Sequence, residues 1–496
     1  MRSASLKIEP QRHLLWIGLV FFSIAMLFIA LYVKVGPFAQ SVHVFGLGFE
    51  LVSAGLGVWL IGIVVWWARQ RGRFDPFEPP VWISLNAYVL VILNVWWLQR
   101  DQLPYVRWLQ DNYQTMMPLA VILFGVGLSA LWGGYVWGFR RLRRNAQQLQ
   151  PRAGAMRVSN VVIIWFLGWI AGVIAVLTGV NSYLGTGSTT WANYFAFVDL
   201  VTNAAATALI IRHFRHSTLK SWFWFVLAVG SNIVLALIVG SKSFAQTLLL
   251  LAMYFYYANK RLPIRGLIIG LVIIVMFVPV VNNYRDALQN LDRGSGVGLS
   301  DRAEALATNL QEVITQPFDT LFLATTDTFS NRQGGMLNIA ASAMFLHPNL
   351  QPFVGLEMVE YFFPQLIPRV LFPFKSTERP SLYMITTTYG GAPSEYSFTA
   401  IGQFADSYRA GGWATVIIWF GVLGIFTAWL YLEGPGSGNL AGTVFYITVL
   451  TLILRYDFDT ATILIQLIQF GILLWLIVMR GMFVWMKKPQ DVTVSA

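Results

Sequence analysis

The sequence contains no cysteine, so the chain offers no disulfide bond, no thiolate nucleophile and no cysteine ligand for a metal ion. Charge is also scarce: 11% of the 496 residues are charged, whereas 56% are hydrophobic and the mean hydropathy is +0.60. Charged residues make up about a quarter of an ordinary soluble domain, so this composition excludes one. It predicts an integral membrane protein whose loops are held by packing and hydrogen bonds.

Apolar runs of about 20 residues, the length that crosses a bilayer core of roughly 30 Å, recur along the whole chain. They predict an all-α integral membrane bundle of about twelve transmembrane helices, because a helix satisfies its own backbone hydrogen bonds in lipid. The runs cover residues 14–33, 44–68, 80–98, 115–137, 158–178, 191–211, 221–239, 244–258, 263–281, 413–432, 440–454 and 460–479. No small-residue cleavage site precedes Lys34, so we expect the first run to remain as a helix.

Lysine and arginine are concentrated in every second connection between these runs. The two tails and the second, fourth, sixth and eighth connections hold 21 of the 34. Short cytoplasmic loops carry such an excess, so we expect a multi-pass protein with both termini in the cytoplasm. The net charge of +11 is therefore a topology signal and does not indicate a nucleic-acid partner.

The same orientation places one long segment on the extracytoplasmic side of the membrane. Residues 282–412 contain too little uninterrupted apolar sequence to cross a bilayer, so they form the large periplasmic loop domain. Transmembrane helices one to nine precede it in residues 1–281. Helices ten to twelve and a cytoplasmic tail follow it in residues 413–496.

Helical patterns within this loop predict a small helical cap. Ser300 or Asp301 can cap a helix whose apolar face we expect to lie on the membrane surface. Further helical stretches are predicted at 335–346 and 355–363, and each is closed by a proline. The loop domain is therefore expected to be helical like the rest of the chain.

Two short polar motifs interrupt the apolar background. Residues 367–375 read I-P-R-V-L-F-P-F-K and precede a Tyr-Gly-Gly at 389–391 and a stretch at 398–412 that runs into a helix. Residues 240–243 read G-S-K-S at the outer end of the seventh run. In composition and order these segments resemble the Wzy-type repeat-unit polymerases of O-antigen and exopolysaccharide synthesis. The chain departs from that pattern at Gln403, where glutamate is frequent, and in residues 240–243, where arginine usually stands in place of the lysine.

The resemblance implies a GT-C-like helical glycosyltransferase at the outer face of the bacterial inner membrane. It would join oligosaccharide repeat units that are carried on a polyprenyl diphosphate, with no nucleotide sugar, no cofactor and no required metal. The expected partners are that lipid-linked oligosaccharide, the membrane lipid and a chain-length regulator protein.

In such a reaction negative charge develops on a leaving diphosphate, and fixed cations stabilise it where no metal is used. Arginine suits this task because its planar fork holds two phosphate oxygens at once. Arg369 is the candidate catalytic cation, since the prolines on either side restrain its backbone. The candidate substrate-binding cations are Lys242, Arg285, Arg332, Lys375 and Arg409.

The acceptor sugar hydroxyl loses a proton as it attacks, so the site also needs a carboxylate or a histidine. Glu395 and Asp406 are the acids closest to the glycine turn, and we take them as the candidate catalytic carboxylates. His347 is the one histidine of the loop. Both acids have a structural alternative, which is an ion pair with Arg379 or Arg409.

Other polar residues have competing interpretations as well. Arg285 can mark the membrane interface, and Lys242 can extend to it. Asp457 and Asp459 form a D-x-D pattern typical of metal-dependent sugar-nucleotide transferases, but sugar nucleotides are cytoplasmic and this turn is predicted outside. Asp199 lies within the sixth run, where it would serve either as a proton carrier or as a hydrogen-bond partner inside the bundle.

Three alternatives to a polymerase stay open: a lipid-carrier glycan ligase, a flippase or secondary transporter, and a non-catalytic membrane scaffold. Transporters bind their substrates near the bilayer midplane, at broken helices and intramembrane charges. This sequence has few such charges, and its polar residues are concentrated in the loop. That distribution favours chemistry on a membrane-anchored substrate at the outer face.

Overall fold

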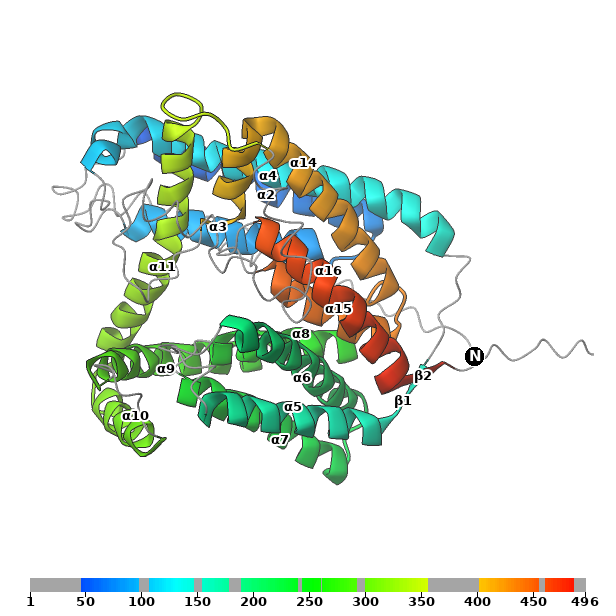
Figure 1. Cartoon of the computed structure of the whole chain (residues 1–496). Helices are drawn as coiled ribbons and strands as arrows, with labels where there is room; N and C mark the ends of the chain where they lie inside the picture. The colour runs from blue at the N-terminus through cyan, green and yellow to red at the C-terminus, as the bar shows by residue number, and fades with distance from the viewer. Residues whose placement is uncertain are drawn as a thin grey trace, which may run out of the picture.

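The structure of the chain is a computed structural model that is almost entirely helical (Figure 1). It describes residues 46–97, 107–146, 154–177, 189–239, 243–259, 261–291, 299–355, 401–454 and 460–485. Eight of the described helices are long and apolar enough to cross a membrane. The prediction of an all-α membrane protein is therefore confirmed.

The helices follow the order of the predicted apolar runs. Before the long connection they are α2 (Gly46–Arg71), α3 (Pro79–Trp97), α4 (Arg107–Ala146), α5 (Val158–Leu177), α6 (Thr189–Arg215), α7 (Leu219–Val239), α8 (Ser243–Asn259) and α9 (Ile264–Leu291). They continue with α10 (Leu299–Ile314), α11 (Phe318–Leu346), α14 (Gln403–Glu433), α15 (Leu440–Ile453) and α16 (Thr460–Leu476), which passes into a π-helical turn, η3 (Ile477–Met482). The run predicted at 14–33 lies outside the described residues. Three further runs form α3, α8 and α15, which are not among the eight membrane-length helices.

The described helices form two groups, which Figure 1 shows above and below one another. The upper group contains α2, α3, α4 and α14, and the lower group contains α5 to α8. The α15 helix contacts both α14 and α6, so it links the two groups. On one side, α11 contacts α9 as well as α3, α4 and α14, and it forms a second link.

The tightest helix pair is α4 with α14, and glycine makes it possible. A Cβ atom on Gly134 would collide with the backbone of Gly421, and one on Gly424 would collide with the Leu131 carbonyl oxygen. Small residues permit such close approach of helices in a membrane, where there is no hydrophobic drive to bring them together. The aromatic ring of Phe404 extends this contact by stacking on Phe124 at a centroid distance of 3.9 Å.

Within the predicted loop domain, the helix at 300–314 is confirmed as α10, but its neighbours differ from the prediction. The apolar side chains of α10 pack against protein, on Val275 and Val280 of α9 and on Leu321 of α11, rather than lying free on a membrane surface. The predicted helix at 335–346 is the end of α11, which begins at Phe318. The stretch predicted at 355–363 lies almost wholly outside the described residues.

The helix ends also extend beyond the apolar runs. The α9 helix continues to Leu291 although its apolar run ends at residue 281, and α14 begins at Gln403 rather than at residue 413. Hydropathy shows where lipid contact stops, whereas a helix continues until its backbone is broken. In α14 that break comes within the helix, at Gly411 and Gly412, the second of which has a φ of 69°.

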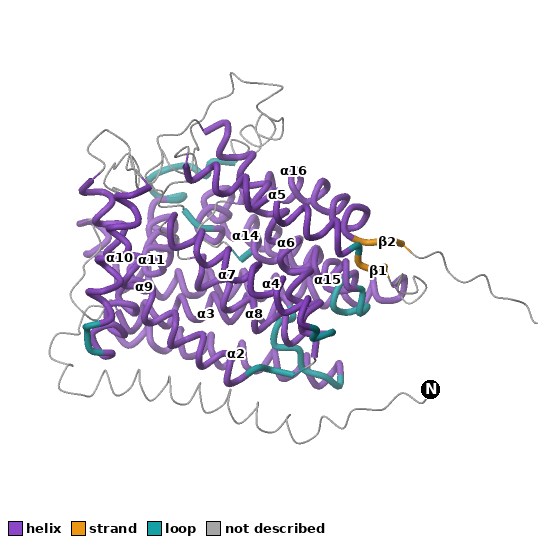
Figure 2. The backbone as a smooth tube through the Cα atoms, turned by 90° about the horizontal axis from the view of Figure 1, so that it is seen from below, coloured by secondary structure: helices purple, strands orange, loops and turns teal. Residues whose placement is uncertain are grey.

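Two pairs of segments that were each predicted on the same face of the membrane are in contact. Strand β1 (Gly154–Met156), in the fourth connection, pairs antiparallel with β2 (Phe483–Trp485), near the C-terminus, at one edge of the molecule (Figure 2). In the same way, the α2–α3 connection contacts the end of α14 through a hydrogen bond from Tyr431 to Asp75. The first turns of α14 lie at the opposite end of that helix.

Candidate functional site

Two candidate site residues, Asp406 and Arg409, form a buried ion pair at the start of α14. Arg409 Nη2 lies 2.8 Å from Asp406 Oδ1, and the side chains are 3% and 1% exposed. Residues three apart on a helix share one face, so this segment presents both groups together. The structure therefore shows the ion pair that was the structural alternative for Asp406.

The second oxygen of Asp406 reaches the start of α16. Oδ2 accepts hydrogen bonds from the Thr460 backbone N–H at 2.9 Å and from the Thr460 hydroxyl at 2.5 Å. A carboxylate at this position satisfies a first-turn N–H group and complements the positive end of the helix. Both oxygens of Asp406 are thus engaged, one with a cation and one with a helix start.

The described residues that flank residues 356–400 lie beside this ion pair. The backbone N–H of Val354 donates to the Arg409 carbonyl oxygen at 3.1 Å, and Gly355 donates to Ala410 at 2.9 Å. On the other flank, Ile401 is buried directly before α14. The ends of the segment that carries the predicted polymerase motif are therefore both fixed next to Asp406 and Arg409.

His347 completes this group of side chains. Its Nδ1 lies 2.8 Å from the Pro352 carbonyl oxygen, which can only accept, so Nδ1 carries the proton. Nε2 is then an acceptor, and it is buried with no hydrogen-bond partner among the described residues. Burial lowers the pKa of His347, and the nearby Arg409 guanidinium lowers it further. Together, His347, Asp406, Arg409 and Thr460 are called the Asp406 cluster below.

The structure describes few of the other predicted site residues. Arg285 is half-buried in the last part of α9. Arg332 lies within α11, but its side chain is outside the described part of the chain. Lys242, Arg369, Lys375 and Glu395 also lie outside it, as do Asp457 and Asp459, so their assignments stay predictions.

Asp406 permits a direct test of its structural role. Asp406→Ala should lower the free energy of unfolding by about 3–5 kcal/mol, because it leaves the buried Arg409 charge uncompensated and the start of α16 uncapped. Thermal unfolding of the detergent-solubilised protein measures this. Asp286→Ala, at an exposed position on α9, is the matched control and should unfold like the parent. Normal stability of Asp406→Ala with lost activity would instead make Asp406 a catalytic carboxylate.

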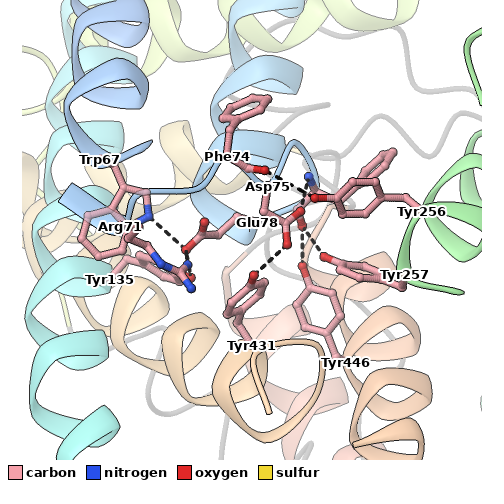
Figure 3. Close-up of polar contacts among 11 residues, drawn as sticks. Trp67, Arg71, Phe74, Asp75, Glu78, Tyr135, Tyr256, Tyr257, Tyr431 and Tyr446 are labelled. Atoms are coloured by element: carbon pink, nitrogen blue, oxygen red, sulfur yellow. Dashed lines mark hydrogen bonds and ion pairs between the residues drawn. The ribbon is translucent and has the colours of Figure 1, made fainter. Parts of the chain in front are cut away.

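A larger polar network, which the sequence analysis did not identify, lies at the other end of α14 (Figure 3). It surrounds the α2–α3 connection, residues 72–78. Tyr431 donates to Asp75 Oδ2 at 2.7 Å, while Tyr446 and Tyr257 donate to the Phe77 carbonyl oxygen at 2.6 and 3.1 Å. The connection is thus bonded by side chains of α14, α15 and α8.

Glu78 is the second carboxylate of this network. Its Oε1 accepts from Trp67 Nε1 at 3.0 Å and from the Tyr135 hydroxyl at 2.6 Å, and it forms an ion pair with Arg71. The Arg71 guanidinium in turn lies over the rings of Trp67, Phe139 and Tyr431. Burial raises the pKa of Glu78, and Arg71 acts in the opposite direction.

We call this set the tyrosine network; its side chains are Trp67, Arg71, Asp75, Glu78, Tyr135, Tyr256, Tyr257, Tyr431 and Tyr446. Each neutral hydrogen bond contributes on the order of 1 kcal/mol and a charged one about 1.5–3 kcal/mol. The network is therefore a major local source of stability. Within it, Phe77 and Glu78 are buried, at 3% and 2% exposed.

Within α6, Asp199 is exposed on its helix and accepts a hydrogen bond from Asn203 at 3.2 Å. Asn203 accepts one from Asn232 of α7 at 3.4 Å. The hydrogen bond fits the second interpretation of Asp199, but the side chain is exposed and does not lie inside the described part of the bundle. No cluster of three or more histidine or carboxylate side chains suited to a metal ion occurs in the described ranges.

No protein-family model matches the chain, and no curated protein or solved structure gives a significant match to it. The class that the structure defines is a helical membrane protein.

Proposed function

We propose that the chain is a metal-independent glycosyltransferase that joins polyprenyl-diphosphate-linked oligosaccharide repeat units. The observation that carries the proposal is the Asp406 cluster: a buried cation, a carboxylate and an imidazole that lie beside the described residues flanking residues 356–400. That segment holds the motif that resembles the Wzy-type polymerases. The proposal places this end of the bundle at the outer face of the bacterial inner membrane, with both termini in the cytoplasm.

In the proposed reaction, a hydroxyl of the acceptor sugar attacks the anomeric carbon of the donor, and the bond from that carbon to the diphosphate oxygen breaks. The leaving diphosphate takes the electron pair, and Arg369 and Arg409 stabilise its charge. The hydroxyl proton goes to Glu395 or to Nε2 of His347. Because both oxygens of Asp406 already accept hydrogen bonds, the proposal gives Asp406 the role of positioning Arg409.

Arg285 at the end of α9 and Arg332 within α11 are further cations of the proposed site. Both belong to helices that contact each other, and α11 also contacts α14, which carries Arg409. Lys242 and Lys375 are assigned to substrate binding on the sequence motifs alone. A chain-length regulator protein is the proposed protein partner.

The glycan that accumulates on the lipid carrier after gene deletion tests the function. A polymerase catalyses the step that lengthens the glycan, so its loss should leave a single repeat unit on the carrier. Mass spectrometry of the extracted lipid-linked glycans measures this. A finished polymer retained on the carrier would instead indicate a ligase, and an unchanged glycan profile would contradict both.

A further inference from the structure

The α2–α3 connection is one of the points at which the two groups of helices are joined. Residues 72–78 belong to the upper group, yet their carbonyl oxygens accept from Tyr256 and Tyr257 of α8, in the lower group. Tyr446 of α15, the helix that links the groups, donates to the same connection. Figure 3 shows these side chains converging on the connection from several helices.

We propose that residues 72–78 are a fixed plug, and that this end of the bundle stays closed throughout the functional cycle. Substrate then reaches the chain only from the end that carries the Asp406 cluster, or from the surrounding lipid. The inference does not depend on which reaction the chain performs. It does separate a protein that works at one face from a transporter, whose two ends open in turn.

Opening this end would require the two groups of helices to separate. The Tyr257 hydroxyl of α8 would then lose its acceptor, the Phe77 carbonyl oxygen, which it shares with Tyr446. A further hydrogen bond holds α8 within the lower group: the Thr207 hydroxyl of α6 donates to the Tyr254 hydroxyl of α8 at 3.0 Å. Moving α8 away from this connection would break the Tyr257 bond, and moving α15 away would break the Tyr446 bond, which favours a single closed arrangement.

Asp75 and Glu78 also hold the α2–α3 connection in place through bonds within the upper group. Asp75 Oδ1 accepts from the Phe77 N–H at 3.0 Å and so folds the connection into a turn. Its Oδ2 accepts from Tyr431 at the end of α14. The ion pair of Glu78 with Arg71 is enclosed by aromatic rings, where water would have to enter before the pair could separate.

Thiol accessibility tests the plug, and the absence of natural cysteine makes single-cysteine variants straightforward. Thr443→Cys places a thiol of similar shape in the first turn of α15, at a site 2% exposed. Ser437→Cys, exposed in the turn before α15, is the matched control, which shows that the reagent reaches this end. The probe is a small charged methanethiosulfonate, applied to inverted membrane vesicles with and without an imposed pH gradient, and to permeabilised cells that are making glycan.

The plug predicts that Thr443→Cys reacts more than about a thousandfold more slowly than Ser437→Cys, with the same ratio under every condition. A transporter's minor open state, populated at roughly 0.1–10%, would instead allow labelling at roughly 0.1–10% of the control rate. A rate at Thr443→Cys that rises with the gradient or during glycan synthesis would overturn the proposal. Should Thr443→Cys fail to accumulate, Thr448→Cys, also 2% exposed on α15, takes its place under the same criterion.

Adding Tyr446→Phe to either cysteine variant should raise the labelling rate, since it removes one hydrogen bond of the plug. A polymerase assay plays no part in this readout, so failure of the proposed function leaves the result interpretable.

Discussion

Replacing Gly134 by alanine is expected to prevent α4 and α14 from packing and to remove most of the folded protein. The added methyl group would collide with the backbone of Gly421. A flexible side chain could relieve such a clash by changing its rotamer, but the backbone cannot. Overpacking of this kind costs about 1–3 kcal/mol or more. The measurement is the fraction of monodisperse protein after detergent extraction, together with its thermal unfolding temperature.

Gly133 provides the matched control, because it is the neighbouring residue on the same helix. A Cβ atom there has no described atom within 4 Å. Gly133→Ala should therefore fold normally or unfold at a slightly higher temperature, since alanine favours a helix by about 1 kcal/mol over glycine. Equal behaviour of the two variants would show that α4 and α14 are not in contact at these glycines.

This helix pair illustrates what the sequence could and could not predict. Hydropathy identified the runs that became α4 and α14, because a lipid-facing helix needs a long apolar stretch whatever its neighbours are. It did not predict which helices pack together. That depends on where small residues on two distant segments meet, and Gly134 and Gly421 are far apart in the chain.

The Asp406 cluster and the tyrosine network also combine features that local sequence predicts with features that depend on contacts between distant segments. The spacing of Asp406 and Arg409 on one helix face predicts their ion pair. The hydrogen bond that Thr460 donates to Asp406, however, depends on a contact between α14 and α16. The sequence pattern does not predict the tyrosine network, because Arg71 also fits the distribution of basic residues that sets topology. Its signal was present in Asp75 and Glu78, two acids in a connection that was otherwise interpreted by its positive charge.

These sites lie at opposite ends of α14 and are built differently. At one end, Asp75 and Glu78 are bonded to tyrosines of several helices, and the connection is closed. At the other end, a buried imidazole nitrogen has no partner among the described residues, and the backbone of α14 is broken at Gly411 and Gly412. A satisfied network favours rigidity, whereas an unsatisfied buried group and a local break are features typical of functional sites. This contrast supports chemistry at the Asp406 end.

Arg369→Lys is expected to abolish polymer formation almost as completely as Arg369→Ala. Arg369 lies outside the described residues, in the segment whose two ends are fixed beside Arg409. If its guanidinium holds two oxygens of the leaving diphosphate, a lysine ammonium cannot replace it, because a point charge does not reproduce the bidentate fork. Loss of one such donor costs on the order of a hundredfold or more in rate. Polymer length in cells carrying each variant measures the effect, with membrane abundance determined in parallel.

Arg379→Lys, in the same segment, is the matched control, because the role predicted for Arg379 is that of an ion-pair partner of an acid. An ion pair tolerates lysine, so this variant should make polymer of nearly normal length. Near-normal polymer from Arg369→Lys as well would show that Arg369 only braces its segment. The role of stabilising the diphosphate would then pass to Arg409, whose position beside His347 is set by Asp406, and to the motif lysine Lys242 and Arg332 of α11. Arg409→Lys would be the variant that decides between them, since lysine could keep the ion pair with Asp406 while losing the fork.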